Sequence, residues 1–324
     1  MKHLPLLAFF LCSLSLQAID ASVSFATFRT EAQPYVEVYL HLSGQTVKYV
    51  PASDSTYKAA VEVIILFKQG EEIVKFDKYA LNSPEVKRPV DFIDLRRFGL
   101  DNGDYRLIVA VQDLNQEKNA KEFSTDITID FEDGKLQHSD LELLASYSRV
   151  EGEPLPEQKM FVKNQLLLEP LPYNFYSRHS SQLIFYNEVY GADQAVGEDF
   201  VLSYSIEKVN NGKGKPVVLA HRRLKPKSVI PVLQTIDISK LASGNYQLVV
   251  ELRDRERELL SRKTAFFQRS NPFLEEEPLA IRDFNIEQEF VQELGRDELE
   301  YSLRALTPKM PQTDVEFVDG LIKN

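Results

Sequence analysis

An internal repeat with a spacing of 141 residues constrains this chain more than any other feature (244 − 103 = 141). From residue 103 the chain reads Gly-Asp-Tyr-Arg-Leu-Ile-Val-Ala-Val-Gln-Asp, and from residue 244 it reads Gly-Asn-Tyr-Gln-Leu-Val-Val-Glu-Leu-Arg-Asp. A period this long exceeds that of solenoid and propeller repeats, so it predicts two duplicated domains. The residues that define the repeat are Gly103 and Gly244, Tyr105 and Tyr246, and Asp113 and Asp254.

Both copies of the repeat place apolar side chains at every second position, which is typical of a half-buried antiparallel strand. The glycine predicts a tight turn into the strand. A tyrosine two residues later is typical of the corner of immunoglobulin-like sandwiches, where the hydroxyl caps the backbone. Asp113 and Asp254 come where each strand should end, and we expect them to terminate the strands. Binding a cation is the alternative interpretation of these two carboxylates.

Other segments repeat the strand pattern in the same order. Residues 35–42 alternate apolar and polar side chains, and residues 183–190 are their counterpart in the second half. Residues 59–67 form a nearly continuous apolar run that corresponds to residues 200–209. Short strands separated by turn residues favour sandwiches over βαβ units. The sequence therefore predicts an all-β fold of two tandem immunoglobulin-like antiparallel β-sandwich domains, followed by a short helical C-terminal segment.

Composition changes along the chain predict the domain boundaries. A Pro- and Glu-rich stretch at 151–157 suggests a linker between the sandwiches, and helical periodicity begins after the Asn-Pro at 271–272. The predicted parts are a signal peptide over 1–18, a first sandwich over 19–134, a linker over 135–160, a second sandwich over 161–271 and a helical connector or tail over 272–324.

The N-terminus has the pattern of a secretory signal peptide. Lys2 precedes an apolar run over residues 4–16, and small residues follow, which predicts cleavage near Ala18. We expect an exported protein that is periplasmic, outer-membrane-associated or extracellular, with no transmembrane segment after cleavage. The single cysteine, Cys12, lies within the segment to be removed, so the mature protein would have no thiol.

Charge and motif patterns narrow the functional classes. The formal net charge is −11, and the basic residues form no stripe, which argues against nucleic acid as a partner. His41, His138, His179 and His221 fall in no HxH, HExxH or HxxxH pattern, and the chain contains no GxSxG elbow. The sequence therefore predicts a protein that is not an enzyme and that needs no cofactor or metal.

An aromatic-rich stretch in the second half is the candidate binding face. Such rings can stack on a sugar or a peptide, although Phe and Tyr in strands are more often core residues, and the chain has no Trp. Glu37 and Glu188 occupy equivalent places in the two repeats and are expected to face solvent. The candidate binding residues are Tyr173, Tyr176, His179, Tyr186 and Tyr190.

Several passages of the chain resemble the N-terminal region of GWxTD-domain proteins, which are exported proteins typical of the Bacteroidota. The passages are residues 139–143, 176–190, 237–246, 253–255 and 266–272. The resemblance implies the sandwiches and part of a helical connector, and it carries no catalytic residues. The Gly-Trp-x-Thr-Asp motif itself is missing, since the chain contains no Trp.

These patterns support one main functional hypothesis. We expect an exported, non-enzymatic cell-envelope protein whose sandwiches serve protein interaction or scaffolding, with an unknown protein partner or an absent C-terminal domain. The alternative is a carbohydrate-binding accessory module that uses the aromatic stretch over residues 173–190.

Overall fold

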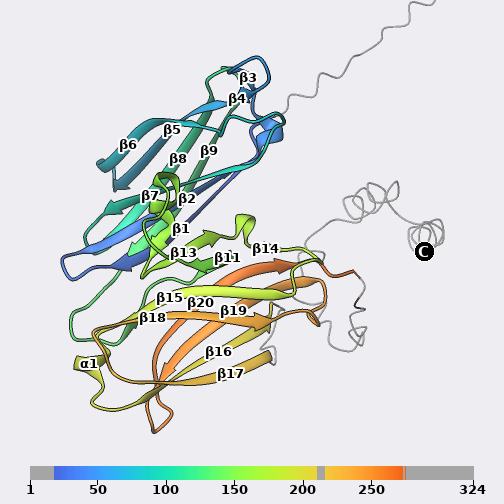
Figure 1. Ribbon diagram of the computed structural model, residues 1–324. Helices are drawn as coiled ribbons and strands as arrows, with labels where there is room; N and C mark the ends of the chain where they lie inside the picture. Colours follow the sequence, from blue (N-terminus) through green and yellow to red (C-terminus); the bar gives the residue numbers. More distant parts are fainter. Residues whose placement is uncertain (1–17, 210–215, 273, 275–324) are drawn as a thin grey trace, which may run out of the picture. The chain divides into compact units, whose positions relative to one another are not determined.

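The computed structural model describes residues 18–209, 216–272 and 274, in which almost every strand pairs antiparallel with its neighbours (Figure 1). The strands form two sandwiches, which confirms the predicted all-β, immunoglobulin-like fold. Residues 1–17 of the predicted signal peptide and the predicted helices of the tail lie outside the described residues. Within the described part of the chain, no helix is both long enough and apolar enough to cross a membrane.

The first sandwich consists of two sheets whose facing sides share one core. Alternate side chains from several strands of each sheet fill this core, as period-two burial requires. We call the two sheets the first inner sheet and the first outer sheet. The first inner sheet contains β1 (Ala21–Arg29), β2 (Pro34–Leu42) and β7 (Phe92–Gly99). The first outer sheet contains β6 (Glu72–Asn82), β5 (Ala60–Gln69), β8 (Gly103–Asp113) and β9 (Ala120–Ile129), while β3 (Val50–Pro51), β4 (Tyr57–Lys58) and the 3-10 turn η1 (Gly44–Thr46) lie in the connections.

The second sandwich repeats this plan with additional strands. Its second inner sheet contains β18 (Val229–Asp237), β15 (Gln182–Tyr190), β10 (Gln137–His138), β11 (Glu142–Arg149), β13 (Leu166–Pro170) and β12 (Val162–Lys163). Its second outer sheet contains β14 (Phe175–Tyr176), β20 (Leu259–Arg269), β19 (Gly244–Arg253), β16 (Phe200–Lys208) and β17 (Pro216–Leu224). Short turns of helix connect these strands: η2 (Pro156–Phe161), η3 (Pro172–Asn174) and α1 (Ala192–Ala195).

The repeated strands occupy equivalent positions in the two sandwiches. β8 lies between β5 and β9, and β19 lies between β16 and β20. The hydroxyl of Tyr105 donates to the carbonyl of Asp101 at 3.0 Å, and that of Tyr246 donates to the carbonyl of Ala242 at 3.1 Å. Each tyrosine thus ties the strand to the residue four positions before it, as a tyrosine corner does.

The glycines and aspartates of the repeat also fulfil their predicted local roles. Gly103 and Gly244 adopt φ values of 154° and 155°, which L side chains rarely adopt. Asp113, the last residue of β8, accepts a hydrogen bond from the backbone N–H of Asn115, and Asp254, which follows β19, accepts one from the N–H of Glu258. Both carboxylates organise the turn that ends the strand.

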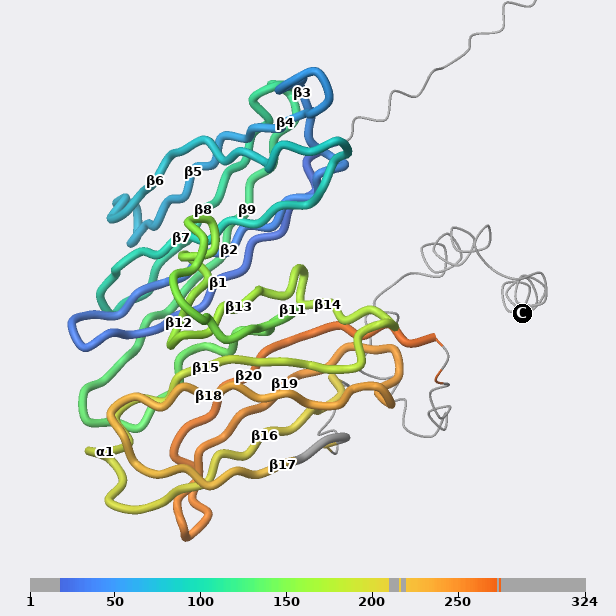
Figure 2. Tube along the Cα trace, viewed as in Figure 1, coloured from blue at the N-terminus to red at the C-terminus, as the bar shows by residue number. Residues whose placement is uncertain are grey.

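The predicted linker over residues 135–160 is wrong. It contains β10 and β11, which pair with β15 in the second inner sheet, and it ends in η2. The Pro- and Glu-rich composition describes only the connection between β11 and η2. The strands before it give no alternating signal, because β10 has only two residues and β11 buries only its first three. The second sandwich therefore begins at β10, and the green trace in Figure 2 enters it there before reaching the hairpin of β12 and β13.

The two inner sheets also pack against each other. Buried side chains from both form a third apolar cluster that is separate from the two sandwich cores. The order of layers is therefore first outer, first inner, second inner and second outer sheet. As a consequence, the first inner sheet is covered on both faces.

Candidate functional site between the two sandwiches

The layer between the inner sheets, here called the interdomain layer, has an apolar part built from alternate residues. These are the residues that point away from each sandwich's own core, and all are at most 8% exposed. Removing such side chains from water stabilises the contact by roughly 1.5–3 kcal/mol for each large residue. The first sandwich contributes Ala26, Phe28, Tyr39 and Leu95, and the second contributes Leu144, Leu168, Ile184 and Tyr186.

A tight hairpin carries a lysine into this layer. β12 and β13 pair so that Lys163 lies opposite Leu166, leaving Asn164 and Gln165 as the two-residue loop. Both loop residues have positive φ, 48° and 63°, as a type I′ hairpin turn requires. The short turn fixes the register of the hairpin and so directs the Lys163 side chain toward the first sandwich.

Lys163 forms an ion pair with one carboxylate from each sandwich. Its ammonium lies 2.6 Å from an oxygen of Glu37 on β2 and 2.7 Å from an oxygen of Glu142 on β11. All three side chains are at most 7% exposed. The ammonium also lies 3.7 Å from the ring centroid of Phe28, a cation–π distance. A buried charge is tolerated only when it is paired, and here the pairing joins the two domains.

The two carboxylates differ in their second partners. Glu37 also accepts hydrogen bonds from the Arg97 guanidinium at 2.7 Å and from the Tyr39 hydroxyl. Burial by itself would raise the pKa of Glu37, but Lys163 and Arg97 outweigh burial and hold that pKa below its usual value. Burial raises the pKa of Glu142, against the attraction of Lys163 and with the support of the Glu37 charge. Of the two carboxylates, Glu37 is therefore the one whose ionised form its surroundings favour more.

A third buried carboxylate lies in the same layer. Glu188 accepts hydrogen bonds from the hydroxyls of Tyr186 at 2.6 Å and Tyr190 at 2.7 Å, and from the Asn164 amide at 2.8 Å. The expectation that Glu37 and Glu188 face solvent is wrong, since they are 0% and 7% exposed. They occupy the outward-pointing positions of their strands, but the other sandwich covers those positions.

A further polar contact joins the sandwiches at Asp140. One carboxylate oxygen accepts hydrogen bonds from the N–H and the hydroxyl of Thr27 on β1, at 2.8 and 2.7 Å. The other oxygen accepts one from the Lys263 ammonium on β20 at 2.7 Å. This single residue thus connects the first inner sheet to the second outer sheet.

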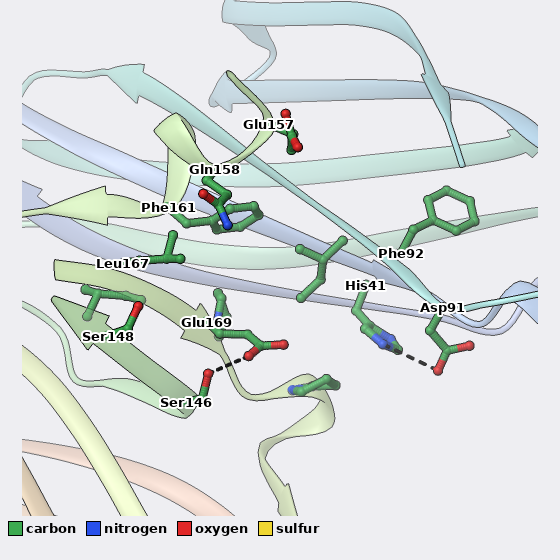
Figure 3. Close-up of a pocket in the computed structure, with 14 residues that line it drawn as sticks. His41, Asp91, Phe92, Ser146, Ser148, Glu157, Gln158, Phe161, Leu167 and Glu169 are labelled. Carbon is green, nitrogen blue, oxygen red and sulfur yellow. Dashed lines mark hydrogen bonds and ion pairs between the residues drawn. The ribbon is translucent and has the colours of Figure 1, made fainter. Parts of the chain in front are cut away.

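A cavity of about 520 Å³ opens at one side of the interdomain layer (Figure 3). Both sandwiches line it, with residues 91–93 and His41 on one side and residues of β11, β13 and η2 on the other. Its apolar lining includes Ile93, Phe161 and Leu167, which are partly exposed. Carboxylates lie around the opening, and one of them, Glu169, accepts a hydrogen bond from Ser146 at 2.6 Å. The volume is in the usual range of small-ligand sites.

His41 borders this cavity and has an unusual environment. Its Nε2 lies 3.8 Å from an oxygen of Asp91, and its Nδ1 is buried without a hydrogen-bond partner among the described residues. Burial lowers the pKa of His41 despite the neighbouring carboxylates of Asp91 and Asp20. The ring packs edge-on against Tyr173, with centroids 5.1 Å apart. Tyr173 has a φ of 57°, which is costly for a bulky side chain, and such strain tends to occur at functional sites.

The candidate binding face does not form a single surface. Tyr176, Tyr186 and Tyr190 are at most 3% exposed. Tyr176 packs in the second core, Tyr186 lies in the interdomain layer, and Tyr190 reaches the core of the first sandwich. Tyr173 and His179 remain exposed, and Tyr173 alone contacts the cavity lining, through His41. Three of the predicted rings are therefore unavailable for stacking on a sugar.

Lys163 and Asn164 were not identified from the sequence. The only signal was a lysine between apolar Val162 and a turn-forming Asn, in a segment that otherwise resembles a short buried strand. A lysine in that setting requires a buried anion, but the sequence gives no means of locating it on β2, more than a hundred residues earlier.

Ser203 and His221 form the one side-chain serine–histidine pair among the described residues. The Ser203 hydroxyl lies 2.8 Å from Nδ1 of His221, across β16 and β17. A catalytic serine also needs a carboxylate that orients the histidine, and within the described part of the chain His221 has no recorded hydrogen bond to one. No group of three or more His, Cys, Asp or Glu side chains suited to a metal ion occurs among the described residues.

No protein-family model and no curated protein matches the chain. Solved structures with a similar arrangement include red sea bream transglutaminase, at 8% identity and a TM-score of 0.24, over 77% of this chain and 31% of that one. The fibronectin(III)-like modules of Clostridium thermocellum CbhA match at 11% identity and a TM-score of 0.21, over 75% of this chain and 88% of that one. A glycosyl hydrolase family 2 member from Bacteroides cellulosilyticus matches at 11% identity and a TM-score of 0.25, over 72% and 26%. The chain thus spans about a third of the transglutaminase and about a quarter of the hydrolase.

Proposed function

We propose that this protein is an exported, non-enzymatic component of the cell envelope, whose two sandwiches act as one docking and scaffolding unit for a protein partner. The observation that carries the proposal is the interdomain layer, in which Lys163 pairs with Glu37 and Glu142 across the domain boundary. A layer with buried, paired charges specifies one relative placement of two domains more narrowly than an apolar contact would. A spacer or scaffold needs such a fixed placement.

The proposal includes export and kinship with GWxTD-domain proteins. The apolar run at 4–16 and the small residues before Ala18 support export. Residues 139–143, one of the passages that carry the resemblance, contribute Asp140 and Glu142 to the interdomain layer. A relationship to GWxTD-domain proteins would therefore concern the two joined sandwiches rather than either sandwich alone.

The test uses the full chain with a C-terminal affinity tag, produced in a Bacteroidota host. After mild crosslinking, envelope extracts are purified and the bound proteins are identified by mass spectrometry. We expect the protein in the envelope fraction, with its N-terminus near Ile19 and with one specific protein partner. The control is Lys163→Glu, which places a fourth carboxylate in the interdomain layer and should abolish partner recovery while the export signal remains intact.

The contrary outcome is equally concrete. Retention in the cytoplasm with an intact N-terminus would exclude export. Failure to recover any protein partner, together with strong binding of the purified full chain on a glycan array, would replace protein docking by carbohydrate binding.

A further inference from the structure

The cavity between the sandwiches combines an apolar floor with an acidic rim. Ile93, Phe161 and Leu167 form the floor and are partly exposed, whereas Asp91, Glu157 and Glu169 are exposed around it. In Figure 3 these carboxylates come from three different places: the segment before β7, the turn η2 and the strand β13. The rim is therefore assembled only when the two sandwiches are joined.

Among the described residues, no Lys or Arg forms an ion pair with the rim carboxylates, and Asp91 lies 3.8 Å from Nε2 of His41. None of the 14 lining residues is Lys or Arg. The nearby cations are engaged elsewhere: Lys159 pairs with Glu153 at 2.8 Å, and Arg97 pairs with Glu37 at 2.7 Å. An apolar floor under uncompensated carboxylates fits a ligand with an aliphatic stem and a cationic head, which is the chemistry of lysine and arginine side chains.

Exposed apolar side chains next to the cavity indicate that the ligand is part of a protein. Leu155 is 56% exposed, and its N–H bonds to Gln158 of the lining. Tyr173 is 46% exposed and packs on His41. Tyrosine and large apolar residues beside a pocket are typical of protein interfaces, in which a partner covers both the pocket and its margin.

We propose that this cavity receives a lysine or arginine side chain from an extended basic segment of a partner protein. The inference rests on the proposed docking function and specifies its site and partner chemistry. The guanidinium or ammonium would lie at the acidic rim, and its stem would pack on Ile93, Phe161 and Leu167.

The experiment selects binders from a random heptapeptide phage library on the immobilised full chain. Binding of the enriched synthetic peptides is then measured by fluorescence polarisation. We expect enriched peptides to share one Lys or Arg, and replacement of that residue by norleucine to abolish binding. In the chain, Asp91→Asn and Glu169→Gln should each weaken binding about tenfold, the usual effect of a lost charge-assisted hydrogen bond. Both substitutions keep an acceptor for the bonds from Gly44 and Ser146.

The matched control is Glu256→Gln, an exposed residue in the turn between β19 and β20 that does not line the cavity. It removes the same charge and should leave affinity unchanged. Circular dichroism melts of all variants separate loss of binding from loss of folding. Affinity should also fall as salt is raised, since the rim carboxylates are exposed.

Three outcomes would overturn the inference. Enriched peptides without a basic residue, or peptides that bind the Asp91→Asn/Glu169→Gln double variant unchanged, would place docking elsewhere while leaving the proposed function intact. Spermidine binding that needs the rim carboxylates, with no enriched peptide, would assign the cavity to small amines. If neither an enriched peptide nor spermidine binds, the cavity does not have this role. The proposed function is tested separately, by recovery of a protein partner from the envelope.

Discussion

Different interactions stabilise the sandwich cores and the interdomain layer. Each core is almost wholly apolar and is closed at its corner by one tyrosine, Tyr105 or Tyr246, in the same geometry. The interdomain layer mixes apolar side chains with a buried lysine and carboxylates drawn from both sandwiches. The difference teaches that duplication reproduced the cores, whereas the contact between them depends on strands that only the second copy has.

The largest expected effect comes from removing the cation of the interdomain layer. Lys163→Met leaves Glu37 and Glu142 buried together without their shared partner, which should lower the free energy of unfolding by about 3–5 kcal/mol. Urea denaturation followed by circular dichroism measures it. The triple variant Glu37→Gln/Glu142→Gln/Lys163→Met should recover most of the loss. A single variant as stable as the parent would show that the ion pairs do not form.

The next effect distinguishes the two carboxylates. Glu37→Gln removes the carboxylate that Lys163 and Arg97 share and should cost about 2–4 kcal/mol, whereas Glu142→Gln should cost less, about 1–2 kcal/mol. Burial raises the pKa of Glu142, whereas the pKa of Glu37 is lowered, so the charge of Glu142 contributes less to the ion pairs. The same denaturation measurement compares them, and equal losses would contradict the asymmetry.

A pH experiment measures how a buried histidine of the second sandwich, His138, contributes to stability, separately from the ion pairs of the interdomain layer. Burial, with Lys263 adding to it, lowers the pKa of His138 to about 3, against about 6.5 in the unfolded chain. Because the folded pKa is the lower one, the stabilisation is complete above about pH 6.5 and is lost as the pH falls toward 3. The free energy of unfolding should drop by about 2 kcal/mol between pH 7 and pH 5.

His138→Gln should flatten this dependence, because the group that titrates is then absent. His179→Gln, at an exposed position, is the matched control and should keep it. An unchanged slope in the His138 variant would assign the acid sensitivity to other groups, with Glu37 the first to examine below pH 4.5, since its own pKa is lowered.

The smallest effect tests whether the two cores are equivalent. Tyr105→Phe and Tyr246→Phe each remove one hydroxyl hydrogen bond to the carbonyl four residues earlier and should each cost about 1 kcal/mol. Similar losses in thermal denaturation would confirm that the two corners do the same work. A loss in only one variant would show that the two tyrosines, although equivalent in the sequence repeat, contribute differently to the stability of the fold.

The sequence was informative where a pattern is local. The Gly-x-Tyr strands, their spacing and the apolar alternation of residues 35–42 identified both cores, because period-two burial depends on neighbouring residues alone. Prediction from the sequence failed where a residue is buried by a segment that is distant in the sequence. Glu37 alternates with valines and was assigned to solvent, yet β11 and the hairpin of Lys163 cover it. The candidate rings of Tyr186 and Tyr190 failed for the same reason, since they seal domain contacts instead of forming a face.

Coverage of the first inner sheet on both faces bears on any attempt to study the domains separately. Cutting the chain before β10 would uncover Phe28, Tyr39 and Leu95 together with the carboxylate of Glu37. The isolated N-terminal half would then expose an apolar stripe on its first inner sheet. We expect it to self-associate instead of remaining monomeric. Truncated variants should therefore keep both sandwiches together.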